Sequence, residues 1–144
     1  MVKTDIVFRN KITVSDYIRL RKTTEWKELS VRQVRAGLKN SVAALSAKIN
    51  GETIGMARVV GDRGYVMLVV DVVVVPAYRR QGVATRMIAE LMRLIEASVK
   101  DGEGVMLQLM AAKGLEGFYS RFGFRARPNE ENGAGMTQWI EGGA

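Results

Sequence analysis

The 144-residue sequence contains no cysteine and no histidine. The absence of cysteine excludes disulfides, thiolate metal ligands and a cysteine nucleophile. The absence of histidine excludes imidazole ligands and catalysis by a Ser–His pair. Any acid–base chemistry must therefore use tyrosine, aspartate, glutamate, lysine or bound water. We expect no metal cofactor.

Long apolar runs are also missing. The longest apolar stretch, Val66 to Val75, is interrupted by Asp71 and is too short to span a bilayer. Residues Met1 to Asn10 lack the continuous apolar segment of a signal peptide. These absences predict a cytoplasmic protein with no membrane partner.

Acidic residues are fewer than basic ones, which gives a formal net charge of +7. A basic domain attracts phosphate, so a nucleic-acid-binding or ligand-binding module without catalysis is one interpretation. The basic residues are spread along the chain without interleaved aromatics, and no RNA-binding or helix-turn-helix pattern is present. We therefore favour a basic surface that draws in a small anionic ligand, and expect no nucleic-acid partner.

The length fits one domain over residues 1–144, present as a monomer or a homodimer. Apolar runs and turn residues predict strands over residues 5–9, 42–49, 53–60, 65–75 and 105–109, with further strands from Arg125 through Met136 to Ile140. Helices are predicted after caps at Thr13 and Ser30, and over residues 82–99 and 113–122. This order predicts an α/β (α+β) fold, a mixed β-sheet with helices on both faces.

The most informative segment runs from the apolar strand Val72–Val75 through Pro76 and a basic turn into a helix at Gly82. The first N–H groups of such a helix are unpaired and lie at the positive end of its dipole. Gly82 and the small Ala84 allow a ligand to approach the backbone closely. The segment therefore predicts a diphosphate site.

This segment is not a Walker loop, because no G-x-x-x-x-G-K-S/T is present. Instead, Arg79-x-x-Gly82-x-Ala84 resembles the acetyl-CoA-binding motif of GNAT N-acetyltransferases, R/Q-x-x-G-x-G/A directly after a strand. The segment Gly117–Phe124 is similar to a second GNAT pattern, F-Y-x-x-x-G-F, near the end of the chain. The alternative is an ordinary strand–turn–helix with a solvated basic turn. The resemblance implies the GNAT fold, with six to seven strands, and acetyl-CoA as co-substrate of an N-acetyltransferase.

The resemblance also implies roles for individual residues. Tyr119 is the expected general acid, which protonates the leaving thiolate, although it could instead be a core tyrosine. Main-chain N–H groups of the central strand are expected to stabilise the acetyl oxygen. The residues expected to contact the co-substrate are Val72, Val73, Val74, Arg79, Arg80, Gln81, Gly82, Val83, Ala84, Thr85, Lys113 and Phe118.

The general base departs from the family pattern. Leu68 and Leu107 stand where some GNAT enzymes carry a glutamate, and neither can accept a proton. Asp71 is the candidate catalytic base, because a carboxylate inside an apolar strand is costly unless it has a role. Three alternatives remain open: a structural Asp71, Glu25 or Glu28 as the base, and proton removal by water. Ala112 also replaces an asparagine that many members use on the pantetheine arm, next to Lys113.

The acceptor is the least determined part. Trp26 lies between the first two predicted helices, where GNAT enzymes often cover the acceptor site, and could either stack on an amine or plug the core. Glu25 and Glu28 could attract a cation to the same loop. We expect a small-molecule primary amine, with a protein or peptide amine as the alternative.

Overall fold

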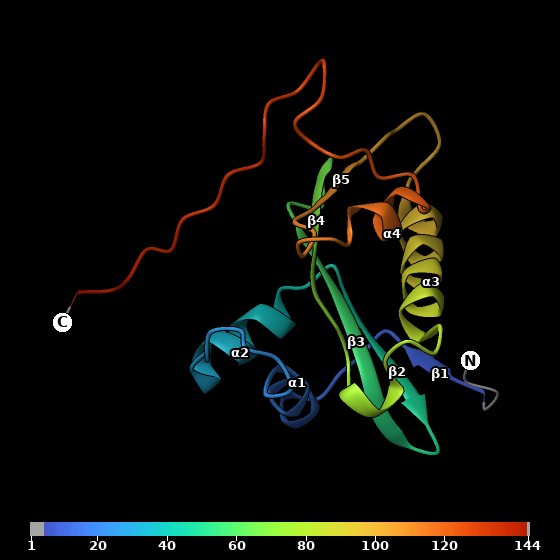
Figure 1. Ribbon diagram of the computed structural model, residues 1–144, viewed down its shortest axis with the longest axis vertical. Helices are drawn as coiled ribbons and strands as arrows, with labels where there is room; N and C mark the ends of the chain where they lie inside the picture. The colour runs from blue at the N-terminus through green and yellow to red at the C-terminus, as the bar shows by residue number, and fades with distance from the viewer. Residues whose placement is uncertain (1–4, 144) are drawn as a thin grey trace. The chain divides into compact units, whose positions relative to one another are not determined.

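The computed structural model describes residues 5–143 (Figure 1). Residues 1–4 of the stretch considered for a signal peptide therefore lie outside the described residues. The chain divides into two compact units, Met1–Leu109 and Met110–Ala144, and each is described by itself. A single domain over residues 1–144 stays a prediction.

The first unit holds one mixed sheet of five strands in the order β1-β2-β3-β4-β5. Neighbouring strands are antiparallel from β1 to β4, and β4 pairs with β5 in parallel. Its elements are β1 (Val7–Arg9), α1 (Val14–Arg21), α2 (Val31–Lys39), β2 (Ala43–Ile49), β3 (Glu52–Gly61), β4 (Val66–Val74), the short 3₁₀ helix η1 (Pro76–Tyr78), α3 (Val83–Ser98) and β5 (Met106–Leu109).

Helices cover both faces of this sheet, with α1 and α2 on one side and α3 on the other (Figure 1). The buried face of α3 carries Val83, Met87, Ile88, Leu91 and Ile95, at the predicted helical spacing. The helix packs closely because β3 has a glycine beneath it. A Cβ at Gly55 would lie 2.5 Å from the Met87 sulfur and 3.3 Å from the Val73 carbonyl oxygen.

Local sequence signals place several element ends as predicted. Thr13 Oγ1 caps α1 by accepting from the Asp16 N–H at 3.0 Å. Ser30 and Gln33 form a reciprocal capping box at the start of α2. Asn50 and Gly51 both have positive φ and join β2 to β3 in a tight turn.

A β-bulge interrupts the pairing of β3 with β4. Val70 pairs with Arg58 and Val73 pairs with Met56, so two residues of β4 oppose the single Ala57. The first of those two is Asp71, whose φ of 57° is left-handed and unusual for a residue other than glycine. The bulge changes the direction of the last part of β4.

The second unit contains α4 (Glu116–Ser120), which is shorter than the predicted helix over residues 113–122. Gly114 and Gly123 both have φ of 91°, which a right-handed helix cannot contain, so they bound it. Phe118 contacts the Tyr119 ring edge-to-face at 5.0 Å between centroids, and Tyr119 contacts Phe124 in the same way at 6.1 Å.

The prediction of strands from Arg125 to Ile140 is wrong, since residues 125–143 form neither helix nor strand. The sheet therefore has five strands instead of six to seven. In this segment, side chains make hydrogen bonds to backbone groups that a strand would use. The Asn129 side-chain oxygen accepts from the N–H groups of Glu131 and Asn132, and the Arg127 guanidinium donates to the Gly133 carbonyl oxygen.

Candidate active site

The turn between β4 and α3 has an unusual backbone. Arg80 has φ of 60° and Gly82, the N-cap residue of α3, has φ of 81°. No side chain caps this helix, and Gly82 leaves room for a ligand at its first N–H groups. This turn retains the open helix end that an anionic ligand requires.

Two of the predicted co-substrate side chains hold the turn itself. Arg79 Nε donates to the Val74 carbonyl oxygen at 2.8 Å, and the Gln81 side chain donates to the Ala77 carbonyl oxygen at 2.9 Å. Val83 is 1% exposed, so its side chain belongs to the core. Of the predicted residues in this turn, Arg79, Arg80, Gly82 and Thr85 are exposed, and Ala84 is half-buried. The features of this turn that suit an anion are the backbone N–H groups at the start of α3 and the charge of Arg80.

Within the sheet of the first unit, the end of β4 has one free edge, where it pairs with no other strand. Pairing with β5 stops at Val69 and Leu109, while β4 continues to Val74 beside β3. The Val75 N–H donates to the Ile54 carbonyl oxygen of β3 at 2.9 Å. Because N–H directions alternate along a strand, Val73 also points its N–H toward β3, whereas Val72 and Val74 point theirs toward the free edge. Of the three predicted valines, these two have N–H groups on the unpaired edge of β4.

Asp71 lies at the centre of a charged cluster, and its side chain is only 9% exposed. Its Oδ1 accepts from Arg21 Nη1 at 2.9 Å. Its Oδ2 accepts from Arg58 Nε at 3.0 Å and from the Tyr17 hydroxyl at 2.7 Å. Both carboxylate oxygens are thus engaged, which favours the structural interpretation over the catalytic base.

The sequence analysis missed the three partners of Asp71. Tyr17 and Arg21 are four residues apart on α1, so they share one helix face, which is the signal that could have found them. Arg58 faces the bulge from β3 and also donates to the Gly37 carbonyl oxygen at 3.0 Å. The pairing of Asp71 with these side chains spans 13 to 54 residues of sequence and has no local signature.

The loop after α1 presents the predicted acceptor residues to solvent. Trp26 is 45% exposed, so it does not plug the core. The Arg21 guanidinium carbon lies 5.3 Å from the centre of the Trp26 ring, and Arg21 Nη2 donates to the Lys27 carbonyl oxygen at 2.6 Å. Glu25 and Glu28 are both exposed. Arg21 therefore connects this loop to Asp71.

The second unit places Tyr119 in its aromatic cluster. Tyr119 is buried, and burial raises the pKa of its hydroxyl above the ordinary value. The hydroxyl therefore stays protonated at neutral pH, as a general acid requires. Phe118 is half-buried against it and Lys113 is exposed.

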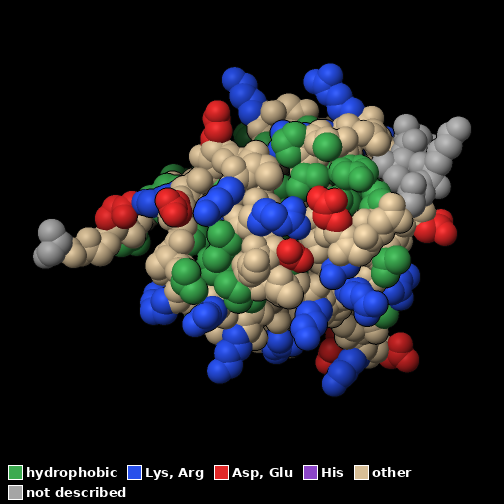
Figure 2. Space-filling model, turned by 90° about the horizontal axis from the view of Figure 1, so that it is seen from below, with side chains coloured by type: hydrophobic (Ala, Val, Ile, Leu, Met, Phe, Trp, Pro, Cys, Tyr) green, Lys and Arg blue, Asp and Glu red, His purple; other side chains and the backbone are tan. Residues whose placement is uncertain are grey.

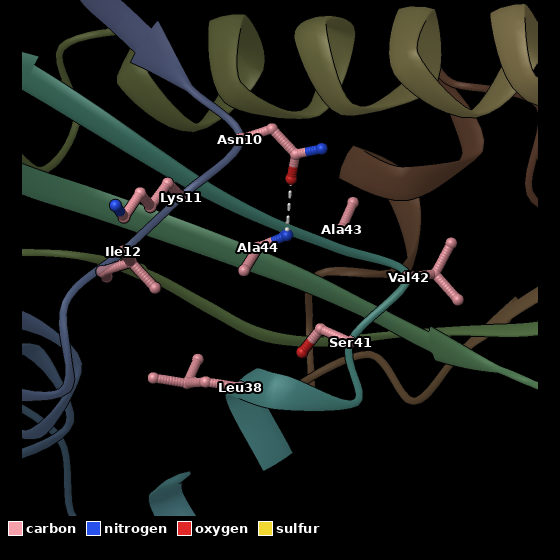
Figure 3. Close-up of a pocket in the computed structure, with 8 residues that line it drawn as sticks. All are labelled: Asn10, Lys11, Ile12, Leu38, Ser41, Val42, Ala43 and Ala44. Atoms are coloured by element: carbon pink, nitrogen blue, oxygen red, sulfur yellow. Dashed lines mark hydrogen bonds between the residues drawn. The ribbon is translucent and has the colours of Figure 1, made fainter. Parts of the chain in front are cut away.

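A cavity of about 280 Å³ lies elsewhere in the first unit (Figure 3). It opens between the segment before α1 and the segment from α2 into β2, and Asn10 accepts from the Ala44 N–H across it at 2.9 Å. None of the predicted site residues lines this cavity. On the face seen in Figure 2, lysine and arginine side chains are scattered and do not form one stripe.

No helix within residues 5–143 is both long and apolar enough to cross a bilayer. Over the same residues, no group of three or more acidic side chains is placed to hold a metal ion.

The fold is similar to several solved acetyltransferases. A probable acetyltransferase from meticillin-resistant Staphylococcus aureus shares 24% identity and a TM-score of 0.79, over 94% of this chain and 100% of that chain. Glucosamine-6-phosphate N-acetyltransferase from Arabidopsis thaliana shares 15% identity and a TM-score of 0.68, over 95% and 99%. Ribosomal-protein-S18-alanine N-acetyltransferase from Escherichia coli shares 17% identity and a TM-score of 0.69, over 86% and 80%.

No curated protein gives a significant sequence match. The family model of the acetyltransferase (GNAT) domain, however, matches residues 14–139, which is most of the chain. The match includes β4, the turn at Gly82 and the segment around Tyr119. The chain therefore belongs to the GNAT family of acetyltransferases.

Proposed function

We propose that this acetyltransferase moves the acetyl group of acetyl-CoA to the primary amine of a small molecule. The observation that carries the proposal is the uncapped start of α3, where Gly82 with φ of 81° leaves the first N–H groups open. A diphosphate suits this helix end, because the N–H groups and the helix dipole both favour an anion. Membership of the GNAT family supports acetyl-CoA as the co-substrate.

In the proposed reaction, the amine nitrogen attacks the thioester carbonyl carbon, a C–N bond forms and the C–S bond breaks. The free-edge N–H groups of Val72 and Val74 are assigned to the carbonyl oxygen as it becomes negative. The Tyr119 hydroxyl is assigned to the departing thiolate, which takes its proton, and solvent then returns a proton to the phenolate. Burial raises the Tyr119 pKa, so the phenol carries its proton at neutral pH.

The amine must also lose a proton. Asp71 is a weak candidate for this step, because Arg21, Arg58 and Tyr17 already donate to its two carboxylate oxygens. We assign the proton instead to bound water, which then passes it to solvent. This assignment needs no further carboxylate in the site.

The small-molecule acceptor rests on the loop after α1. An exposed Trp26 offers an aromatic face for stacking, and Glu25 beside it offers a negative charge to an ammonium group. The names of two structural neighbours refer to a sugar phosphate and to a protein, so the fold itself does not select the acceptor.

The experiment is a screen of amines with acetyl-CoA, in which acetyl transfer is measured by the release of the free coenzyme A thiol. The proposal expects some small primary amine to have a higher kcat/KM than any peptide amino terminus or lysine peptide. A peptide that exceeds every small amine would replace the small-molecule assignment by protein acetylation. Salt-sensitive nucleic-acid binding without acetyl-CoA binding would instead favour a binding module.

A further inference from the structure

We infer that Asp71 is a positioning residue, which acts through Arg21 to hold the bulge of β4 and the Trp26 loop in one arrangement. The effect on catalysis rests on the acetyl transfer proposed above, whereas the coupling within the first unit does not.

The left-handed backbone at Asp71 needs stabilising contacts from other elements. A left-handed conformation is unfavourable for a residue with a side chain, although aspartate tolerates it better than most. Here the side chain is fixed by Arg21 and Tyr17 from α1 and by Arg58 from β3. These three contacts tie the bulge to two other elements and so stabilise the re-aimed end of β4, where Val72 and Val74 present their N–H groups.

The same arginine also orders the loop. Arg21 uses Nη1 for Asp71 and Nη2 for the Lys27 carbonyl oxygen, and its guanidinium lies against the Trp26 ring. A planar guanidinium can make these contacts together because its donors form a rigid fork. Lysine at this position would keep the charge but could not reach both oxygens in that geometry. Arg21 therefore connects the bulge to Trp26 through its contacts with both.

The electrostatics make Asp71 necessary for this link. Arg21 and Arg58 both lie around Tyr17, and their side chains are only 14% and 16% exposed. Two partly buried cations repel each other, and Asp71 supplies the negative charge between them. Without it, Arg21 is expected to swing toward solvent, and the contacts with Lys27 and Trp26 are then lost.

A single-tryptophan protein allows a test that does not depend on activity. Trp139→Phe leaves Trp26 as the only tryptophan. In this background, acrylamide quenching of Trp26 fluorescence is measured for Asp71→Asn, Arg21→Lys and Asp16→Asn. Asp16 is a matched control. It lies on α1, as Arg21 does, and like Asp71 its carboxylate accepts from a hydroxyl and from an arginine, here Thr53 and Arg19. Thermal unfolding confirms that each variant is folded.

The inference expects stronger quenching in both Asp71→Asn and Arg21→Lys and no change in Asp16→Asn. With an acceptor in hand, kcat/KM should fall by about 100-fold in the same two variants, since small displacements of positioned groups have effects of this size. Acetyl-CoA affinity should remain close to that of the parent.

Two results would overturn the inference that Asp71 positions the loop through Arg21. Unchanged quenching in Asp71→Asn would show that Asp71 does not order the loop. A loss of activity in Asp71→Asn that formate restores, with Arg21→Lys fully active, would make Asp71 the general base. If no amine is acetylated by the parent, the proposed function fails, but the quenching still decides the coupling.

Discussion

The Tyr17 hydroxyl donates a 2.7 Å hydrogen bond to Oδ2 of Asp71, across 54 residues of sequence. Tyr17 is 2% exposed, and burial together with the bond and charge of Asp71 raises its pKa. A raised tyrosine pKa stabilises the folded state at any pH below the unfolded value of about 10, and this contribution disappears as pH rises through the folded value.

The first prediction concerns this bond. Tyr17→Phe should lower the free energy of unfolding by about 1 kcal/mol near pH 8, since one hydrogen bond is lost. The difference between the parent and the variant should shrink above about pH 10, where Tyr17 ionises on unfolding. Urea unfolding of both proteins from pH 8 to 11 measures this difference in unfolding free energy. A difference that stays constant over this range would contradict the assigned pKa direction.

The second prediction concerns the packing of α3 on the sheet. Gly55→Ala places a methyl group 2.5 Å from the Met87 sulfur and 3.3 Å from the Val73 carbonyl oxygen. The overpacking should cost about 1–3 kcal/mol of unfolding free energy. Gly104→Ala is the control, because nothing lies within 4 Å of its added Cβ. Equal stabilities of the two variants would mean that α3 shifts freely.

The third prediction concerns the general acid. Tyr119→Phe keeps the aromatic contacts with Phe118 and Phe124 but removes the hydroxyl. Its kcat should fall by about 10²–10⁴-fold, the usual range for general acid–base catalysis, while acetyl-CoA affinity changes little. Steady-state kinetics and calorimetry separate the two effects. An unchanged kcat would reduce Tyr119 to a packing residue.

The fourth prediction concerns the acceptor loop. Trp26→Ala should raise the KM of the acceptor far more than that of acetyl-CoA, because it removes an exposed aromatic surface from that loop. Tyr65→Ala, at another exposed aromatic, serves as the control and should change neither value. Equal increases for both substrates in Trp26→Ala would indicate a structural role only.

The sequence predicted the parts of the fold that local chemistry determines. These parts depend on residues that are at most three positions apart in the sequence. They are the helix caps at Thr13 and Ser30 and the Asn50–Gly51 turn. The apolar face of α3 follows from its own periodicity. The strand–turn–helix around Gly82 was likewise predictable, because its turn residues directly follow the apolar strand.

The parts that failed depend on distant residues. Strands were predicted from Arg125 through Met136 to Ile140, but Met136 and Ile140 are 89% and 83% exposed and form no strand. A strand needs a partner that its own sequence does not specify. The setting of Asp71 was hidden for the same reason, since Tyr17 and Arg21 approach it only after folding.

The fifth prediction tests the central claim, that acetyl-CoA binds at the start of α3. Gly82→Val and Gly102→Val both place a β-branched residue at a φ near 80°, so both should lose similar stability. Nothing lies within 4 Å of a Cβ at Gly102, which makes it a matched control for strain alone.

The direct measurement is calorimetric titration of acetyl-CoA into the parent protein and these two variants. We expect binding to the parent, near-parental affinity in Gly102→Val, and at least about a tenfold loss of affinity in Gly82→Val, or 1.4 kcal/mol. Equal affinities in Gly82→Val and the parent, or no binding of acetyl-CoA to the parent at millimolar concentration, would contradict this expectation.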